Sequence, residues 1–234
     1  MKQLYITVKT EYPSAIPIRN LTYSSTRILQ ERGFTKDNTL FATSLCRDEL
    51  NQYSQYEFYK EWGLGFQFGG LAGFPTCGEV GLGAFADHIP DQGKVFVFYG
   101  SHIGLDESGH LGELKRPGQT RRTVSCGSLA RVFSDLKSGS ESTNKVRCEQ
   151  DFLYSQLQEI INPNEIATLT FKDLTDFVFD HISESLKQLL EVCDPQNLAL
   201  LGGVLINTGR DEDFFVPKEF VVSGEDLLPL LKSP

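Results

Sequence analysis

The fold of this chain is constrained most strongly by continuous apolar runs that alternate with helical patterns. Residues 95–99 (Val-Phe-Val-Phe-Tyr) are all apolar or aromatic, as expected of a strand that is buried on both faces. Comparable runs predict strands at 38–45, 198–206 and 214–222. Strands that alternate with helices are typical of an α/β fold with a mostly parallel central sheet flanked by helices.

Helices are predicted where apolar side chains recur on one face, and residues 1–234 are interpreted as a single domain. The predicted helices cover 17–31, 51–62, 79–88, 150–161 and 171–192, and a further helix begins at Cys126. Residues 63–83 contain eight glycines, and a short strand is expected there at 64–68. Residues 138–144, rich in Ser and Gly, are the one linker-like stretch.

The composition argues against nucleic acid and membrane partners. The chain has 22 Lys and Arg and 31 Asp and Glu, a formal net charge of −9, which offers no general footprint for a polyphosphate. The longest charge-free apolar stretch, 64–77, is shorter than the ~20 residues that cross a bilayer. The N-terminus resembles neither a signal nor a transit peptide. Five widely spaced cysteines without a Cys-x-x-Cys pair fit a reducing compartment. We expect a soluble, cytoplasmic protein.

Three candidate metal ligands are predicted to meet at one edge of the sheet. Cys46 and His102 each follow a predicted strand, and Cys126 begins a helix. The carboxyl ends of parallel strands converge, so these side chains are expected to lie together. Two thiols and one imidazole leave the fourth position of zinc open, as in catalytic sites. Each residue alone is more often structural, and only the joint pattern indicates a metal.

Asp48 is a candidate catalytic residue because it lies two positions beyond Cys46. Its carboxylate could bind the metal or orient a metal-bound water, and an arginine partner would hold it away and keep it ionised. The arginines considered are Arg47, Arg116, Arg121 and Arg122. Arg47 is expected to point away from its neighbours. Arg116 is preferred because the Pro-Gly turn after it could aim it inward, although a solvated surface role is equally compatible with the sequence.

Other catalytic motifs are absent from the sequence. It contains no Gly-x-Gly-x-x-Gly, no P-loop and no Gly-x-Ser-x-Gly. A cysteine hydrolase that uses Cys126 with His102 would leave Cys46 without a role. That alternative predicts sensitivity to thiol alkylation with no requirement for metal.

Several segments together resemble the limiting-CO2-inducible B/C proteins of algae and their bacterial relatives. They occur in the expected order over nearly the whole chain, and their specificity lies in the set rather than in any single segment. These segments are 33–35 (Gly-Phe-Thr), 38–51 (Asn-Thr-Leu-Phe-Ala-Thr-Ser-Leu-Cys-Arg-Asp-Glu-Leu-Asn), 69–75 (Gly-Gly-Leu-Ala-Gly-Phe-Pro), 88–91 (His-Ile-Pro-Asp), 100–104 (Gly-Ser-His-Ile-Gly), 116–119 (Arg-Pro-Gly-Gln), 125–127 (Ser-Cys-Gly) and 201–208 (Leu-Gly-Gly-Val-Leu-Ile-Asn-Thr).

That family is similar to the β-carbonic anhydrases in fold and zinc site. The resemblance implies Zn2+ held by Cys46, His102 and Cys126, with Asp48 in an Asp–Arg gate at the fourth position and a homodimer as the basic unit. The chain departs from the β-type Cys-x-Asp-x-Arg pattern because Leu50 stands where the arginine is expected. Algal relatives would be plastidial.

The resulting hypothesis is a zinc carbonic anhydrase that reversibly hydrates CO2 to bicarbonate. Zinc lowers the pKa of its bound water to ~7, so hydroxide is available at neutral pH to attack CO2. A dry wall for the apolar substrate is expected from residues in the glycine-rich stretch: Phe66, Phe68, Leu71 and Phe74. The alternative is a non-catalytic zinc-containing binding or assembly protein of inorganic-carbon handling.

Overall fold

The computed structural model describes residues 2–139, 146–209 and 212–231. Residues 140–144 of the linker-like stretch lie outside this part of the chain. The described helices are α1 (Lys2–Glu11), α2 (Ile18–Glu31), α3 (Gln52–Trp62), α4 (Gly78–Ala86), α5 (Gly127–Ser138), α6 (Glu149–Ile160), α7 (Phe171–Leu189) and α8 (Leu228–Leu231), with 3₁₀ turns η1 (Glu49–Asn51), η2 (Leu71–Gly73), η3 (Leu190–Val192) and η4 (Pro195–Asn197). In these ranges no helix combines the length and the apolar character needed to span a membrane.

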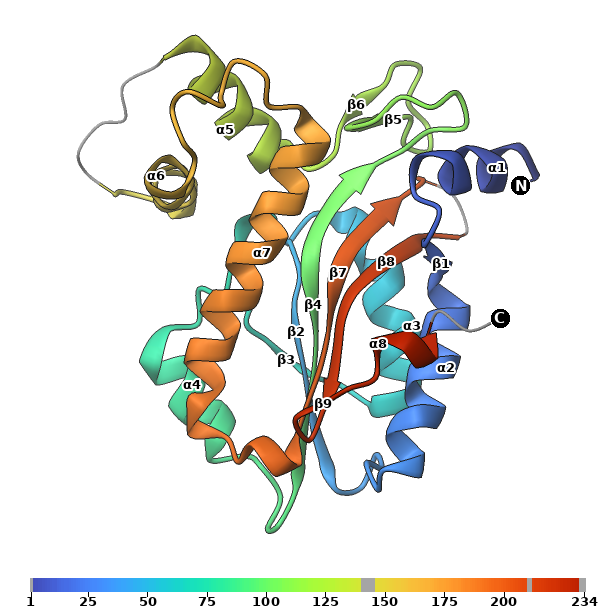
Figure 1. Cartoon of the computed structure of the whole chain (residues 1–234), viewed down its shortest axis with the longest axis vertical. Coiled ribbons are helices and arrows are strands. Elements are labelled where there is room, and N and C mark those ends of the chain that lie inside the picture. Colours follow the sequence, from blue (N-terminus) through green and yellow to red (C-terminus); the bar gives the residue numbers. More distant parts are fainter. Residues whose placement is uncertain (1, 140–145, 210–211, 232–234) are drawn as a thin grey trace.

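The central sheet has seven strands in the order β1-β8-β7-β4-β2-β3, with β9 paired to β8 (Figure 1). Neighbouring strands in the half formed by β3, β2, β4 and β7 are parallel, whereas β8 is antiparallel to β7, β1 and β9. A small separate ribbon pairs β5 with β6. The strands are β1 (Ile16–Pro17), β2 (Thr39–Ser44), β3 (Phe66–Gln67), β4 (Lys94–Gly104), β5 (Glu113–Leu114), β6 (Thr123–Val124), β7 (Leu198–Asn207), β8 (Phe214–Val222) and β9 (Glu225–Asp226).

Helices cover both faces of this sheet, which confirms the predicted α/β class. Helices α2, α3 and α8 pack on one face, and α7 crosses the other, where α4 also lies (Figure 1). Alternate residues of β4 therefore enter different cores: Phe96 and Phe98 face α2 and α3, whereas Val95 and Val97 face α7. This two-sided burial accounts for the uninterrupted apolar run in the sequence.

The expected helices 17–31 and 51–62 correspond to α2 and α3. Helix α2 buries one apolar face and ends before Gly33, whose φ of 78° lies in the left-handed region that glycine tolerates. Helix α7 begins with a capping box between Thr170 and Asp173. Helix α1 was not predicted, because only Leu4 and Val8 of its ten residues are buried and its apolar pattern is weak.

The expectation that His102 follows its strand is wrong. Strand β4 continues to Gly104, and His102 pairs with Leu205 inside the parallel ladder. A polar side chain is tolerated at this buried position because its ring nitrogen Nδ1 is hydrogen-bonded to Asn207. The strand expected at 64–68 is also shorter, since only Phe66–Gln67 pairs with β2.

Candidate metal centre

Three side chains that could hold a metal ion meet at the carboxyl edge of the parallel strands. Cys46 lies just after β2, His102 lies in β4, and Cys126 immediately precedes α5. Their ligand atoms lie within 4.8 Å of one another, and the two Sγ atoms are 3.7 Å apart. All three side chains are buried. In the described ranges no other group of three or more Cys, His, Asp or Glu side chains lies close enough together to hold a metal ion.

The ring of His102 is held on one side and unpartnered on the other. Its Nδ1 lies 2.7 Å from Oδ1 of Asn207, while Nε2 is buried and has no hydrogen-bond partner. A buried ring nitrogen left without a partner is costly, and a metal ion at Nε2 would remove that cost. Two sulfurs and one imidazole nitrogen are ligands that zinc prefers. The residues present therefore fit a zinc ion.

The two sulfurs differ in their local electrostatics. A hydrogen bond from Cys46 lowers the pKa of Cys126, and backbone N–H groups at the start of α5 lower it further. The same hydrogen bond, together with burial, raises the pKa of Cys46. Cys126 is consequently the more readily deprotonated cysteine of the pair, as expected at a helix N-terminus.

A backbone group from the glycine-rich stretch also reaches the site. The N–H of Ala72 donates to Sγ of Cys46 at 3.2 Å, and Ala72 adopts a φ of 57° within η2. The adjacent Gly73 lies so close to β4 that an added Cβ would sit 2.4 Å from the carbonyl oxygen of Gly100. The tight backbone packing of this stretch thus positions a hydrogen-bond donor on a candidate ligand.

Arg116 lies against Asp48 at the rim of this cluster. Its Nη2 is 3.3 and 3.4 Å from the two carboxylate oxygens, and its Nη1 donates to Oγ1 of Thr123 and to the carbonyl of Val124. Its Nε also pairs with Glu49. Burial and a hydrogen bond with Glu49 raise the pKa of Asp48. Four protein partners therefore fix the guanidinium in one orientation.

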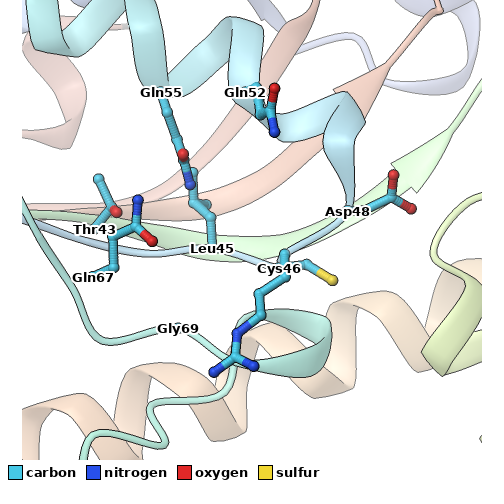
Figure 2. A pocket seen from close by; sticks show the side chains of 9 residues that line it. Thr43, Leu45, Cys46, Asp48, Gln52, Gln55, Gln67 and Gly69 are labelled. Carbon is cyan, nitrogen blue, oxygen red and sulfur yellow. The ribbon is translucent and has the colours of Figure 1, made fainter.

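The other arginines considered for Asp48 have different partners or positions. Arg47 forms an ion pair with Glu149 at 2.9 Å, and Arg122 pairs with Asp106. Arg121 is exposed beside a separate surface pocket. Figure 2 shows Cys46 and Asp48 on the turn after β2, next to a cavity of about 140 Å³ that is also lined by polar side chains: Thr43, Gln52, Gln55 and Gln67.

Comparison with known proteins identifies the family. The model of the limiting CO2-inducible proteins B/C, described as beta carbonic anhydrases, matches residues 15–224. This chain belongs to that family. The crystal structure of PtLCIB4, a homologue of the limiting CO2-inducible protein LCIB, is 30% identical with a TM-score of 0.82, and the match covers 95% of this chain and 98% of PtLCIB4. The structure of LCIB itself shares the fold at 23% identity and a TM-score of 0.70, with 93% and 94% covered. No curated protein sequence matches the chain.

In this member of the limiting CO2-inducible family, the arginine beside the acid comes from a distant loop. Leu50 occupies the position where the β-type pattern has arginine, and its backbone N–H donates to Oδ1 of Asp48. Arg116 approaches from the turn between β5 and β6 instead. The spatial pair is present although the local sequence pattern is not.

Three further residues that contact the centre were not singled out from the sequence: Asn51, Ala72 and Asn207. Asn51 donates to the carbonyl of Cys46 at 3.0 Å, and Asn207 accepts from His102. Asn207 could have been found, because it is the first polar residue after an apolar strand run and ends at the same sheet edge. Ala72 gave no such signal, since it acts through its backbone.

Proposed function

We propose that this chain is a zinc-dependent carbonic anhydrase, with Cys46, His102 and Cys126 as the metal ligands. The observation that carries the proposal is the buried, unpartnered Nε2 of His102, on a ring that brings a nitrogen within 4.8 Å of both candidate thiolate ligands. Membership of a family described as beta carbonic anhydrases supports the same reaction class. Zinc, when bound, acts as a Lewis acid that makes hydroxide available near neutral pH.

Asp48 and Arg116 are proposed to manage the position next to the metal. The charge of Asp48 acts on both His102 and Cys126, so its carboxylate lies beside the candidate ligands. Arg116 binds both oxygens of that carboxylate and holds it as a hydrogen-bond acceptor. In this arrangement the carboxylate of Asp48 accepts a hydrogen bond from the reacting water and so orients the water oxygen toward CO2.

Apolar residues of the glycine-rich stretch are proposed to bind CO2. Phe68 and Phe74 are buried in the same core cluster as Cys46 and Cys126, and Phe66 and Leu71 pack against that cluster. Such a wall excludes water while accepting an apolar molecule. The polar cavity beside Cys46 and Asp48 is a suitable route for bicarbonate and protons.

A homodimer is proposed as the working unit. Strand β3 is an open edge of the sheet, and Leu64, two residues before it, is 91% exposed in the single chain. A second copy that covers this edge would pair the open strand and remove Leu64 from water. Leu64→Glu is expected to shift the mass measured by light scattering from dimer to monomer, and a monomeric native chain would contradict the proposal.

The function is tested by metal content together with turnover. We expect one zinc per chain, and CO2 hydration that is lost after zinc is removed by a chelator and restored when zinc alone is added back. Protein that holds one zinc per chain but shows no hydration above buffer would favour the non-catalytic alternative. Hydration that survives complete zinc removal would exclude the proposed chemistry.

A further inference from the structure

A buried polar chain extends from the candidate metal centre to an acidic side chain that the proposed reaction does not use. His102 contacts Asn207 at the end of β7, and Nδ2 of Asn207 lies 3.3 Å from Oδ2 of Asp213. His102 and Asn207 are fully buried, and Asp213 is 3% exposed. Asp213 comes just before β8, on the far side of β7 from His102.

The neighbours of Asn207 allow only one orientation of its amide. Its Nδ2 faces the carbonyl of Leu50 at 3.3 Å and Oδ1 of Asn51 at 3.2 Å, in addition to Asp213. A backbone carbonyl and a carboxylate can only accept hydrogen bonds. If the amide were turned over, its oxygen would face these acceptors and repel them. The amide oxygen must therefore point at His102.

This orientation determines which nitrogen of His102 carries the proton. Because Oδ1 of Asn207 only accepts, Nδ1 of His102 must be the N–H donor at 2.7 Å. In the neutral ring the lone pair then resides on Nε2, the nitrogen that has no protein partner. That is the tautomer in which Nε2 binds a metal.

Asp213 supplies the carboxylate among the acceptors that hold Asn207. Its Oδ1 accepts from the backbone N–H of Thr208 at 3.0 Å, and its Oδ2 accepts from Oγ of Ser54 at 3.2 Å as well as from Asn207. In the described part of the chain none of its hydrogen bonds comes from a cationic side chain. A buried carboxylate without a cationic partner is costly for stability. We therefore look for a role of Asp213 at the site rather than in charge pairing.

We propose that Asp213 is a positioning residue for the metal centre, which acts through Asn207 to fix the His102 tautomer that leaves Nε2 free for zinc. The inference rests on the proposed zinc site. It extends to the turn that carries Asp48, since Asn207 also bonds Asn51, whose own amide holds the carbonyl of Cys46. One buried acid thus orients ligands from β4 and from the loop after β2.

The variant Asp213→Asn tests this directly, because it keeps the shape of the side chain and replaces one hydrogen-bond acceptor by a donor. An amide at position 213 has one oxygen where the carboxylate has two. The N–H of Thr208 is fixed in the backbone, so that oxygen faces Thr208 and the new NH2 group faces Asn207. Nδ2 of Asn207 then faces a donor and is held only by the two uncharged acceptors, Leu50 and Asn51. The orientation with its oxygen turned away from His102 gains population, which favours the tautomer with the proton on Nε2.

Two quantities are measured. The first is the dissociation constant of zinc, obtained by chelator competition. The second is the set of ring 15N chemical shifts of His102 in the metal-free protein, at a pH where the ring is neutral. We expect Asp213→Asn to weaken zinc binding about 10- to 100-fold, the range for partners of metal-bound histidines. We also expect the ring proton to move from Nδ1 to Nε2. Unchanged zinc affinity, or a ring proton that stays on Nδ1, would overturn the proposal.

Two matched variants separate positioning from general loss of stability. Glu219→Gln makes the same acid-to-amide change at a carboxylate bonded to Tyr99 and Ser183, away from the centre, and should leave zinc affinity unchanged. Asp213→Asn is also made in the background of Asn207→Ala, which removes the side chain through which Asp213 is proposed to act. In that background Asp213→Asn should weaken zinc binding little further, whereas purely additive losses would contradict the proposal.

Failure of the proposed function has a different signature. If the native chain bound no zinc, the zinc proposal would fall, while the ring tautomer of metal-free His102 in Asp213→Asn would still decide the role of Asp213.

Discussion

The guanidinium of Arg116 lies 3.3 Å from a carboxylate oxygen of Asp48, although 68 positions separate the two residues in the chain. The β5–β6 region delivers Arg116, and the loop after β2 delivers Asp48. An acid beside a metal can either occupy the metal or serve the reaction. The partner of the acid determines which of these it does.

Removing Arg116 should convert Asp48 from a helper into a competitor for the metal. We expect Arg116→Ala to lower kcat/KM by about 100-fold or more, the scale for the loss of one oriented charged donor. Zinc content should be unchanged. Arg116→Lys should recover little, because one ammonium cannot reach Asp48 and also keep the contacts with Thr123, Val124 and Glu49 that orient the guanidinium. Arg122→Ala, which removes an ion pair with Asp106 instead, is the control and should be close to native.

Asp48→Asn tests the acid itself. The amide keeps the size of the side chain but loses its charge and half of its acceptor capacity. We expect zinc content near one per chain and turnover reduced by about 100-fold, the scale for a lost general acid–base group. Native turnover in this variant, measured by stopped flow, would remove Asp48 from the mechanism.

The apolar wall makes a prediction about substrate binding. Phe68 is 2% exposed and packs edge-on against Phe85 at 4.8 Å between ring centroids. Phe68→Ala should cost about 3–5 kcal/mol of stability and should also lower turnover at subsaturating CO2. Phe220→Ala creates a comparable cavity on the opposite face of the sheet and should lose stability only. If Phe68→Ala left turnover unchanged, these rings would be core residues and no more.

Asp213 gives the stability curve a pH signature. Burial raises the pKa of Asp213 to about 6, against 3.8 for the free side chain. The folded chain therefore binds more protons than the unfolded chain between these values, so this acid contributes stability at low pH that is lost as the pH rises through about 6. The difference in unfolding free energy between native protein and Asp213→Asn should fall by about 3 kcal/mol over that window. A difference that is flat or rises, measured by urea unfolding, would contradict the assignment.

Much of this arrangement could be predicted from local sequence, and the failures have physical reasons. Helices α2 and α3 can be predicted from their apolar periodicity, and the buried strands from their continuous apolar runs. The continuation of β4 through Ser101 and His102 cannot, because two polar residues inside a buried strand are stable only with partners supplied elsewhere: the carbonyl of Thr175 for Ser101 and Asn207 for His102.

The proximity of Cys46, His102 and Cys126 followed from their places beside predicted elements, since a parallel sheet brings its strand ends together. The partners that orient them did not follow. Asn51, Asn207 and Asp213 are ordinary polar residues in sequence, and their connection depends on the register of β7 against β4. The N–H of Ala72 depends on a backbone conformation that side-chain identity does not reveal.

The central claim is tested most directly by stopped-flow CO2 hydration with the zinc-loaded native chain and with Cys46→Ser under reducing conditions. The account predicts hydration well above the buffer rate for the native chain, and loss of both zinc and hydration in Cys46→Ser. A native chain that carries one zinc and yet hydrates CO2 no faster than buffer, near neutral pH and in mild alkali, would contradict it.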